Sequence, residues 1–132
     1  MTNLRVSEVA ALLRVSDDTV RRWIDQGKLG STRDETGRTV VPGVDVARFA
    51  RNQWPHESPH ESSARNRLQG IVTDVQRDGV MAQVEIQAGP FRLVSLMSRE
   101  AADELGLEPG TLAAAVVKAT TVIVEAVDGV AQ

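Results

Sequence analysis

The protein is a chain of 132 residues in which 42% are hydrophobic and 25% are charged, a composition typical of globular domains rather than of disordered or collagen-like chains. It contains no cysteine, which excludes disulfides, thiolate metal sites and cysteine nucleophiles. The formal net charge of −3 hides an asymmetry, because residues 1–52 carry nine basic and seven acidic side chains whereas residues 63–132 carry six and nine. This change of sign indicates two domains with different roles.

Two further functional classes are disfavoured by the composition. Two Trp, two Phe and no Tyr are too few for a protein that binds single strands by stacking bases on aromatic side chains. No apolar run reaches transmembrane length, and the first residues lack the pattern of a signal peptide. We therefore expect a cytoplasmic protein with no membrane partner.

The first fifty residues predict two short helices joined by a brief turn. Ser7 is expected to cap the first helix, with Glu8 near the positive end of its dipole. Ser16 is expected to cap the second helix, and Gly27 to end it in the left-handed conformation that glycine tolerates. Trp23 shares a face of that helix with apolar neighbours and is therefore expected in the core. Helix pairs of this kind form the helix-turn-helix motif.

A hairpin and a third helix are expected to complete this domain. Residues 29–33 and 38–41 flank the turn at residues 34–37 and predict a short hairpin that would serve as a wing. Pro42 then introduces a helical pattern over residues 44–50. With the Arg-Arg-Trp at residues 21–23, this order of elements resembles the winged helix-turn-helix domain of the MerR and excisionase families over residues 3–52.

The first domain, residues 1–52, is expected to bind double-stranded DNA. Its candidate contacts are exposed polar residues of the second helix and the hairpin: Ser16, Asp17, Thr19, Arg21, Arg22, Lys28, Arg33 and Arg38. A recognition helix uses such side chains to read base edges, and basic residues of a wing reach phosphates. The alternative is that these charges form an ordinary solvated surface.

Residues 53–62 predict a linker, since they hold two prolines, two serines and little apolar material. The two histidines of the chain, His56 and His60, are spaced as i and i+4 within it. A metal site there is disfavoured because the prolines oppose the helix that would bring the two rings together.

After the linker, the spacing of apolar residues changes from a helical pattern to strand-like alternation. This predicts a small β domain over residues 63–132. Five strands are expected, at residues 68–75, 80–86, 91–97, 111–117 and 121–127. A short helix, residues 99–105, is expected between the third and fourth strands, with Ser98 as its cap. The fold class is therefore α+β in two small domains, a winged helix-turn-helix followed by a five-stranded barrel of OB type with one short helix.

Two segments of the second domain carry groups suited to a tetrahedral oxyanion. The candidates are the residues Ser63, Ala64, Arg65 and Asn66, the residues Lys118, Ala119, Thr120 and Thr121, and separately Ser98. Hydroxyls and backbone amides make directional contacts to such a ligand, and two cations offset the charge of a dianion. The alternative is that these are surface charges and ordinary strand ends.

These segments resemble the Mop domain, a molybdate-binding module of OB type. The Ser-Ala-Arg-Asn at residues 63–66 and the Lys-Ala-Thr-Thr at residues 118–121 carry the resemblance most specifically. The resemblance implies molybdate or tungstate as ligand, held where modules meet. Since the chain has one module, it also implies a homo-oligomer, from dimer to hexamer, formed through this domain.

The expected function is a molybdate- or tungstate-responsive transcriptional regulator that binds DNA and is not an enzyme. Two alternatives stay open. One is a storage or buffering protein for the oxyanion, whose first domain serves assembly or tethering. The other is an architectural DNA binder of excisionase type, whose second domain only joins subunits.

Overall fold

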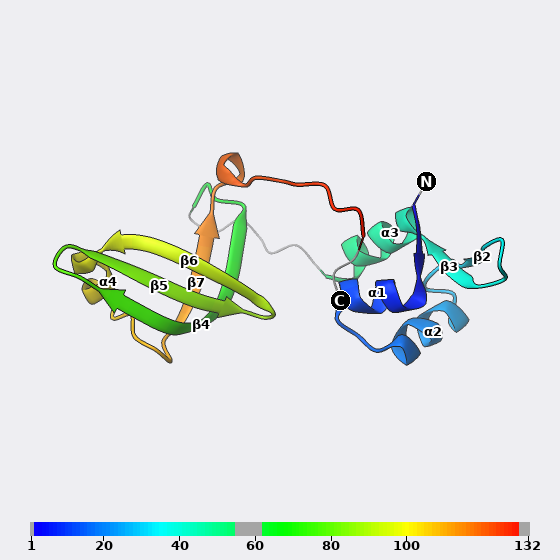
Figure 1. The fold of residues 1–132 in the computed structure, drawn as a ribbon, viewed down its shortest axis with the longest axis horizontal. Coiled ribbons are helices and arrows are strands. Elements are labelled where there is room, and N and C mark those ends of the chain that lie inside the picture. Colours follow the sequence, from blue (N-terminus) through cyan, green and yellow to red (C-terminus); the bar gives the residue numbers. More distant parts are fainter. Residues whose placement is uncertain (1, 55–61, 130–132) are drawn as a thin grey trace. The chain divides into compact units, whose positions relative to one another are not determined.

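The computed structural model describes residues 2–54 and 62–129, which fall into two compact parts treated separately below (Figure 1). Helices and antiparallel sheets are both present, which confirms the expected α+β class. Gln53, expected in the linker, belongs to the last helix of the first part. The rest of the predicted linker, including both histidines, lies outside the described residues except for Trp54 and Ser62. No helix in the described ranges is long and apolar enough to cross a membrane.

The first domain consists of three helices and a three-stranded sheet. Its elements are β1 (Asn3–Arg5), α1 (Val6–Leu13), α2 (Asp17–Asp25), β2 (Thr32–Arg33), β3 (Thr39–Pro42) and α3 (Gly43–Gln53). The two helices, the hairpin β2–β3 and the third helix are all confirmed. Strand β1, which the sequence pattern did not predict, pairs antiparallel with β3, so the order is β1-β3-β2. Its three residues are too few for a periodic signal.

The two expected helix caps have different outcomes. Ser16 caps α2, since its hydroxyl accepts a hydrogen bond from Thr19 N at 3.1 Å. Ser7 is not a cap, because α1 begins one residue earlier, directly after the paired strand β1. Arg5 occupies the cap position, and the Glu8 carboxylate accepts from the Arg5 backbone N–H at 3.0 Å. That bond keeps the pKa of Glu8 below its usual range.

The core of the first domain lies where α1, α2, β3 and α3 meet. Val9, Val20 and Val41 are fully buried there, one from each of the first three elements. Trp23 packs against this core, with its ring centroid 4.7 Å from that of Phe49 on α3. The sequence placed Trp23 in the core, and the structure confirms it.

The second domain is one curled antiparallel sheet with a short helix (Figure 1). Its elements are β4 (Asn66–Arg77), β5 (Met81–Ala88), β6 (Phe91–Ser98), α4 (Arg99–Glu104), β7 (Leu112–Val117) and a single 3₁₀ turn, η1 (Ala119–Thr121). The sheet order is β6-β5-β4-β7, which leaves β6 and β7 as its edges. Four of the five expected strands and the helix are thus confirmed.

Strand β4 belongs to two ladders and bends between them. Its first half, from Asn66 to Ile71, pairs with β7, and its second half pairs with β5. Gly70 lies at the change, where a Cβ atom would be 2.2 Å from the Gln87 carbonyl oxygen. Only glycine permits this approach, which is why β4 can cross β5 so closely and the sheet can curl.

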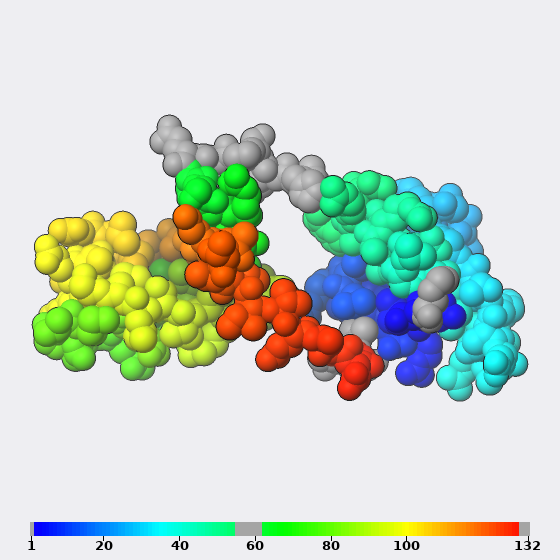
Figure 2. Space-filling view, turned by 90° about the horizontal axis from the view of Figure 1, so that it is seen from above, coloured from blue at the N-terminus to red at the C-terminus, as the bar shows by residue number. Residues whose placement is uncertain are grey.

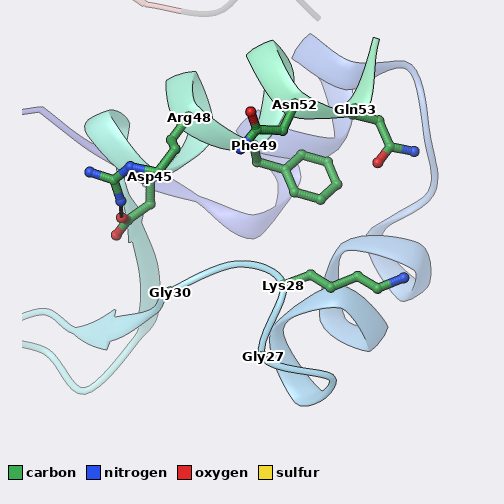
Figure 3. A pocket seen from close by; sticks show the side chains of 8 residues that line it. All are labelled: Gly27, Lys28, Gly30, Asp45, Arg48, Phe49, Asn52 and Gln53. Atoms are coloured by element: carbon green, nitrogen blue, oxygen red, sulfur yellow. Dashed lines mark hydrogen bonds and ion pairs between the residues drawn. The ribbon is translucent and has the colours of Figure 1, made fainter. Parts of the chain in front are cut away.

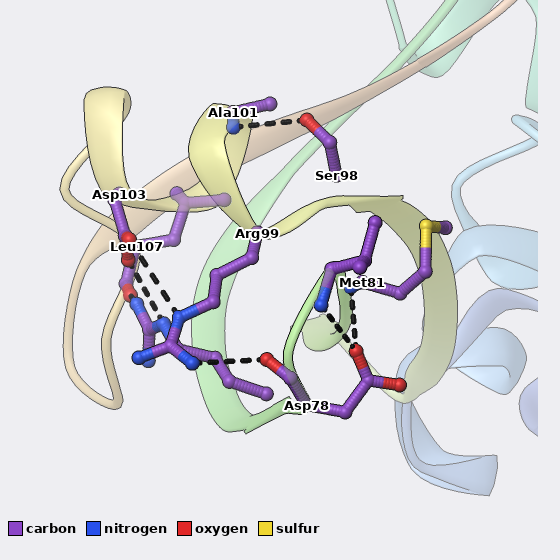
Figure 4. Close-up of polar contacts among 9 residues, drawn as sticks. Asp78, Met81, Ser98, Arg99, Ala101, Asp103 and Leu107 are labelled. Atoms are coloured by element: carbon purple, nitrogen blue, oxygen red, sulfur yellow. Dashed lines mark hydrogen bonds and ion pairs between the residues drawn. The ribbon is translucent and has the colours of Figure 1, made fainter.

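Helix α4 is held against the turn between β4 and β5 (Figure 4). Arg99 donates to the Asp78 carbonyl oxygen at 2.9 Å, and Arg77 donates to the Asp103 carboxylate at 3.0 Å and to the Leu107 carbonyl at 2.9 Å. The Ser98 hydroxyl caps the helix by accepting from Ala101 N at 3.1 Å, as expected. These contacts keep α4 at the end of the sheet away from η1, since Asn66 is the first residue of β4 and Arg77 the last.

The strand expected at residues 121–127 is not formed. Thr121 is the last residue of η1, and residues 122–127 have no strand pairing in the described structure. A strand is stable only where a neighbour completes its hydrogen bonds, and the four-stranded sheet of this chain supplies none to this segment. The expected five-stranded barrel is therefore a four-stranded sheet in the single chain.

Candidate functional site

The exposed face of the first domain brings residues of α2 and the wing to one hollow. Arg21 on α2 and Arg38, in the turn of the hairpin directly before β3, line it together with Asp17. Arg5 and Ser7, which are not among the predicted DNA contacts, line it too. Its position as a basic residue directly before the first helix was the only sequence feature that could have marked Arg5 as a candidate contact. The hollow therefore combines three guanidinium groups from three separate elements.

The wing is shaped by the side chain of Asp34. Its Oδ1 accepts from Thr36 N at 2.9 Å, from Thr36 Oγ1 at 2.7 Å and from Arg38 N at 2.9 Å. These hydrogen bonds, the Thr36 hydroxyl first, hold the pKa of Asp34 below its usual range. Arg33 donates to the Gly37 carbonyl at 2.7 Å and so closes the same turn. The predicted contact Arg33 thus also has a structural role in the wing.

Lys28 lies apart from this group. It lines a second cavity of the same domain, between the end of α2 and α3, with Asp45, Arg48 and Phe49 (Figure 3). Arg48 is paired there with Asp45 at 3.1 Å. Lys28 is exposed, but the structure does not bring it to the hollow of Arg21 and Arg38.

The remaining predicted contacts lie on α2. The Thr19 hydroxyl is 3.0 Å from the Ser16 hydroxyl, so both side chains are engaged at the start of the helix. Arg22 is exposed in the last turn of α2 and does not line the hollow. Contact of any of these residues with DNA stays a prediction.

In the second domain, the two segments selected from the sequence lie side by side. Asn66 opens β4 opposite Val117, the last residue of β7, and Asn66 Nδ2 donates to the Val117 carbonyl oxygen at 3.1 Å. Residues 63–65 therefore lie next to Lys118 and η1. Asn66 and Val117 are 51 positions apart in the sequence, and one ladder position joins them.

The cations of these segments are exposed, and no acidic group of the described residues forms an ion pair with them. Within the described part of the chain, neither Arg65 nor Lys118 forms an ion pair, although Arg65 donates to the Ser63 carbonyl at 3.3 Å. The Lys118 carbonyl accepts from Thr121 N at 3.0 Å and from Thr121 Oγ1 at 2.9 Å, which closes η1. The backbone N–H groups of Ala119 and Thr120 donate to no described residue. An anion would meet the Arg65 and Lys118 cations here, together with two backbone amides that no described residue engages.

Two other predicted oxyanion residues are placed differently. The Ala64 backbone N–H donates to the Ser62 hydroxyl at 3.1 Å, so that amide is already engaged. Ser98 pairs with Met81 at the far end of β6 and caps α4, and the structure does not bring it to Lys118 within one chain.

Comparison with known proteins matches both domains. Residues 4–53 match the family model described as a helix-turn-helix domain, and residues 62–124 match the TOBE domain. Over 63 residues the chain is 38% identical to molybdenum-pterin-binding protein 2 of Clostridium pasteurianum, covering 93% of that protein and 47% of this chain. The chain belongs to the TOBE domain family.

A second curated relative and a solved structure match the TOBE domain as well. The chain is 43% identical over 63 residues to a probable molybdenum-pterin-binding protein of Haemophilus influenzae, covering 91% of it and 47% of this chain. A molybdate-binding protein from Sporomusa ovata is 30% identical, with a TM-score of 0.49, over 51% of this chain and all of that one. The two family matches and the curated relatives confirm the expected fusion of a helix-turn-helix domain with a Mop-like domain.

Proposed function

We propose that this protein is a transcriptional regulator that binds DNA through its helix-turn-helix domain and molybdate or tungstate through its TOBE domain. The observation that carries the proposal is the union, in one chain, of a helix-turn-helix domain with a TOBE domain whose two cation-bearing segments meet at Asn66 and Val117. The relatives named for molybdenum-pterin binding match only the TOBE domain of this chain. The helix-turn-helix domain is therefore a part of this chain that lies outside the match to those relatives.

The DNA contacts are assigned to the hollow of Arg21 and Arg38 and to the wing. Helix α2 presents Arg21 for bidentate bonds to a base, and Arg5 and Arg38 lie on either side for phosphates. A helix-turn-helix protein usually reads two half-sites as a dimer. Association of subunits through the second domain would therefore supply the second DNA-binding domain.

The oxyanion is assigned to Arg65, Lys118 and the amides that begin η1. Two cations match a dianion, and the hydroxyls of Ser63 and Thr120 complete a tetrahedral set. In the single chain these groups are exposed to water, which weakens each contact. A second subunit would cover the ligand, and its Ser98 is the donor that one chain cannot bring to the site.

Ligand binding would change DNA affinity by changing the distance between the helix-turn-helix domains of two subunits. Coupling between such sites is typically about 1–3 kcal/mol, which corresponds to a 5- to 150-fold change in affinity. A protein of this function works in the cytoplasm, where both DNA and the oxyanion are available.

The deciding experiment titrates labelled operator-containing genomic fragments with the purified protein, with and without molybdate, tungstate or sulfate. We expect sequence-selective binding whose affinity changes with molybdate or tungstate and not with sulfate. Oxyanion binding without any DNA binding would favour the storage protein. DNA binding that no oxyanion alters, with no calorimetric heat from any of them, would favour the architectural DNA binder.

A further inference from the structure

Among the described residues that line the hollow of the first domain, one is acidic and three are basic. Arg5, Arg21 and Arg38 contribute the guanidinium groups, and Asp17 in the first turn of α2 contributes the carboxylate. Arg5 and Arg38 come from segments that lie side by side, since Arg5 pairs with Val40; these segments are dark blue and cyan in Figure 2. The carboxylate of Asp17 therefore lies on the face that the proposed function assigns to DNA.

Asp17 and Arg21 are both available to a partner outside the chain. They are four residues apart and project from one face of α2, which places their Cβ atoms about 5–6 Å apart. Both side chains are exposed, and neither forms a hydrogen bond or an ion pair with another described residue. In a helix-turn-helix domain, side chains near the start of the second helix are the ones that reach base edges.

A carboxylate on this face needs a hydrogen-bond donor from the DNA. Phosphates repel it, and so do the acceptor atoms of guanine and thymine in the major groove. Cytosine presents an amino group with no acceptor beside it, whereas adenine presents an amino group next to the acceptor N7. The carboxylate of Asp17 therefore matches cytosine better than any other base, as the guanidinium of Arg21 matches guanine.

We propose that Asp17 accepts a hydrogen bond from the amino group of a cytosine within one base pair of the guanine that Arg21 contacts. Successive bases are about 3.4 Å apart along the duplex, so side chains with Cβ atoms about 5–6 Å apart reach the same or neighbouring base pairs. Asp17 thus adds specificity and lowers affinity for other sequences, because it repels phosphates wherever no cytosine engages it. This inference rests on the proposed function, since it names a base read by the same DNA-binding face.

Asp18 provides an internal comparison. It carries the same carboxylate in the same turn of α2 and is exposed as well, but it does not line the hollow. Both carboxylates lie near the positive end of the helix dipole, so loss of either charge has a similar effect on α2 itself. A change in base preference is expected only from substitution of Asp17.

The test selects binding sites from a random double-stranded DNA library with the purified full-length protein and then measures affinity for every single-base change of the selected site. We expect a cytosine whose replacement weakens binding about fivefold or more. In Asp17→Asn the preference at that position should change from cytosine to adenine, because an Asn amide donates to N7 and accepts from the amino group. In Asp17→Ala no base should be preferred there. Asp18→Asn is the matched control and should retain the cytosine.

Three outcomes would overturn the inference. One is a uniform gain in affinity in Asp17→Asn and Asp17→Ala with every base preference unchanged, which is the behaviour of a solvated surface charge. Another is an equal loss of the cytosine preference in Asp18→Asn. The third is a guanine preference, lost in Arg21→Ala, that lies more than one base pair from the cytosine. An unaltered helical circular dichroism signal establishes that each variant is folded.

Failure of the proposed function is recognised from the unmodified protein alone. If it selects no sequence from the library, the DNA-binding part of the proposed function is refuted together with the inference. If it selects a sequence whose preferences do not depend on Asp17, the inference is refuted and DNA binding stands.

Discussion

Asn66 and Val117 join the two ends of the second domain's polypeptide, because the Asn66 side-chain amide donates to the Val117 carbonyl at 3.1 Å across the β4–β7 ladder. This partly buried bond holds the segment of Arg65 against that of Lys118. The register of one strand pair thus determines whether the candidate oxyanion groups meet.

Asn66→Ala is expected to lower the free energy of unfolding of the second domain by about 0.5–1.5 kcal/mol, since one part-buried hydrogen bond is lost. It should also weaken molybdate binding, because Arg65 and Lys118 lose their common anchor. Chemical denaturation and calorimetry measure the two effects. Gln69→Ala, an exposed change on the same strand, is the control and should leave both unchanged.

Lys118→Ala and Arg21→Ala are expected to separate the two activities. Loss of the Lys118 cation should weaken molybdate binding about tenfold or more, the value of one charge-assisted hydrogen bond, with DNA affinity retained. Loss of Arg21 should weaken DNA binding by about 1–3 kcal/mol with molybdate affinity retained. Calorimetry and fluorescence anisotropy test both. If each folded variant lost both activities equally, the division of labour between the domains would be refuted.

Gly70→Ala is expected to destabilise the second domain by about 1–3 kcal/mol, because the new Cβ would lie 2.2 Å from the Gln87 carbonyl oxygen and backbone must move. Gly79→Ala is the matched control, since a Cβ there has no neighbour within 4 Å. Thermal unfolding of the two variants, measured side by side, compares their stabilities. Equal stability would mean that β4 and β5 can separate at this crossing without cost.

Ser16→Ala is expected to lower the stability of the first domain by about 0.5–2 kcal/mol, because the first turn of α2 loses its side-chain cap. The same change at Ser7 should have a negligible effect, since α1 begins with Arg5 as its cap residue. Denaturant titration of both variants compares the two serines directly. A larger loss for Ser7→Ala would contradict the assigned start of α1.

The wing is expected to loosen at acid pH. The pKa of Asp34 is lowered in the folded chain, so the stabilisation by its carboxylate is present above the unfolded pKa of about 3.9 and is lost as pH falls through the lower folded value. Amide exchange at Thr36 and Arg38 should therefore accelerate below about pH 4 beyond its intrinsic pH dependence. Asp34→Ala should show the faster exchange at neutral pH already, whereas Glu35→Ala, whose side chain forms no hydrogen bond in the described structure, should not.

Local patterns in the sequence were sufficient for most elements of both domains. The cap at Ser16, the left-handed Gly27, the turn at residues 34–37 and the alternation of β5 each act within a few residues. These signals predicted the helices, the wing and four strands. They also selected the two cation-bearing segments of the second domain, whose residue types alone suit an oxyanion.

The tertiary structure decided what depends on partners distant in sequence. Strand β1 exists because β3 pairs with it, and that pairing moves the start of α1 to Val6. Arg5 joins Arg21 and Arg38 only after the domain folds. Residues 122–127 have every local property of a strand, yet remain unpaired, because a strand forms only where another backbone completes its hydrogen bonds.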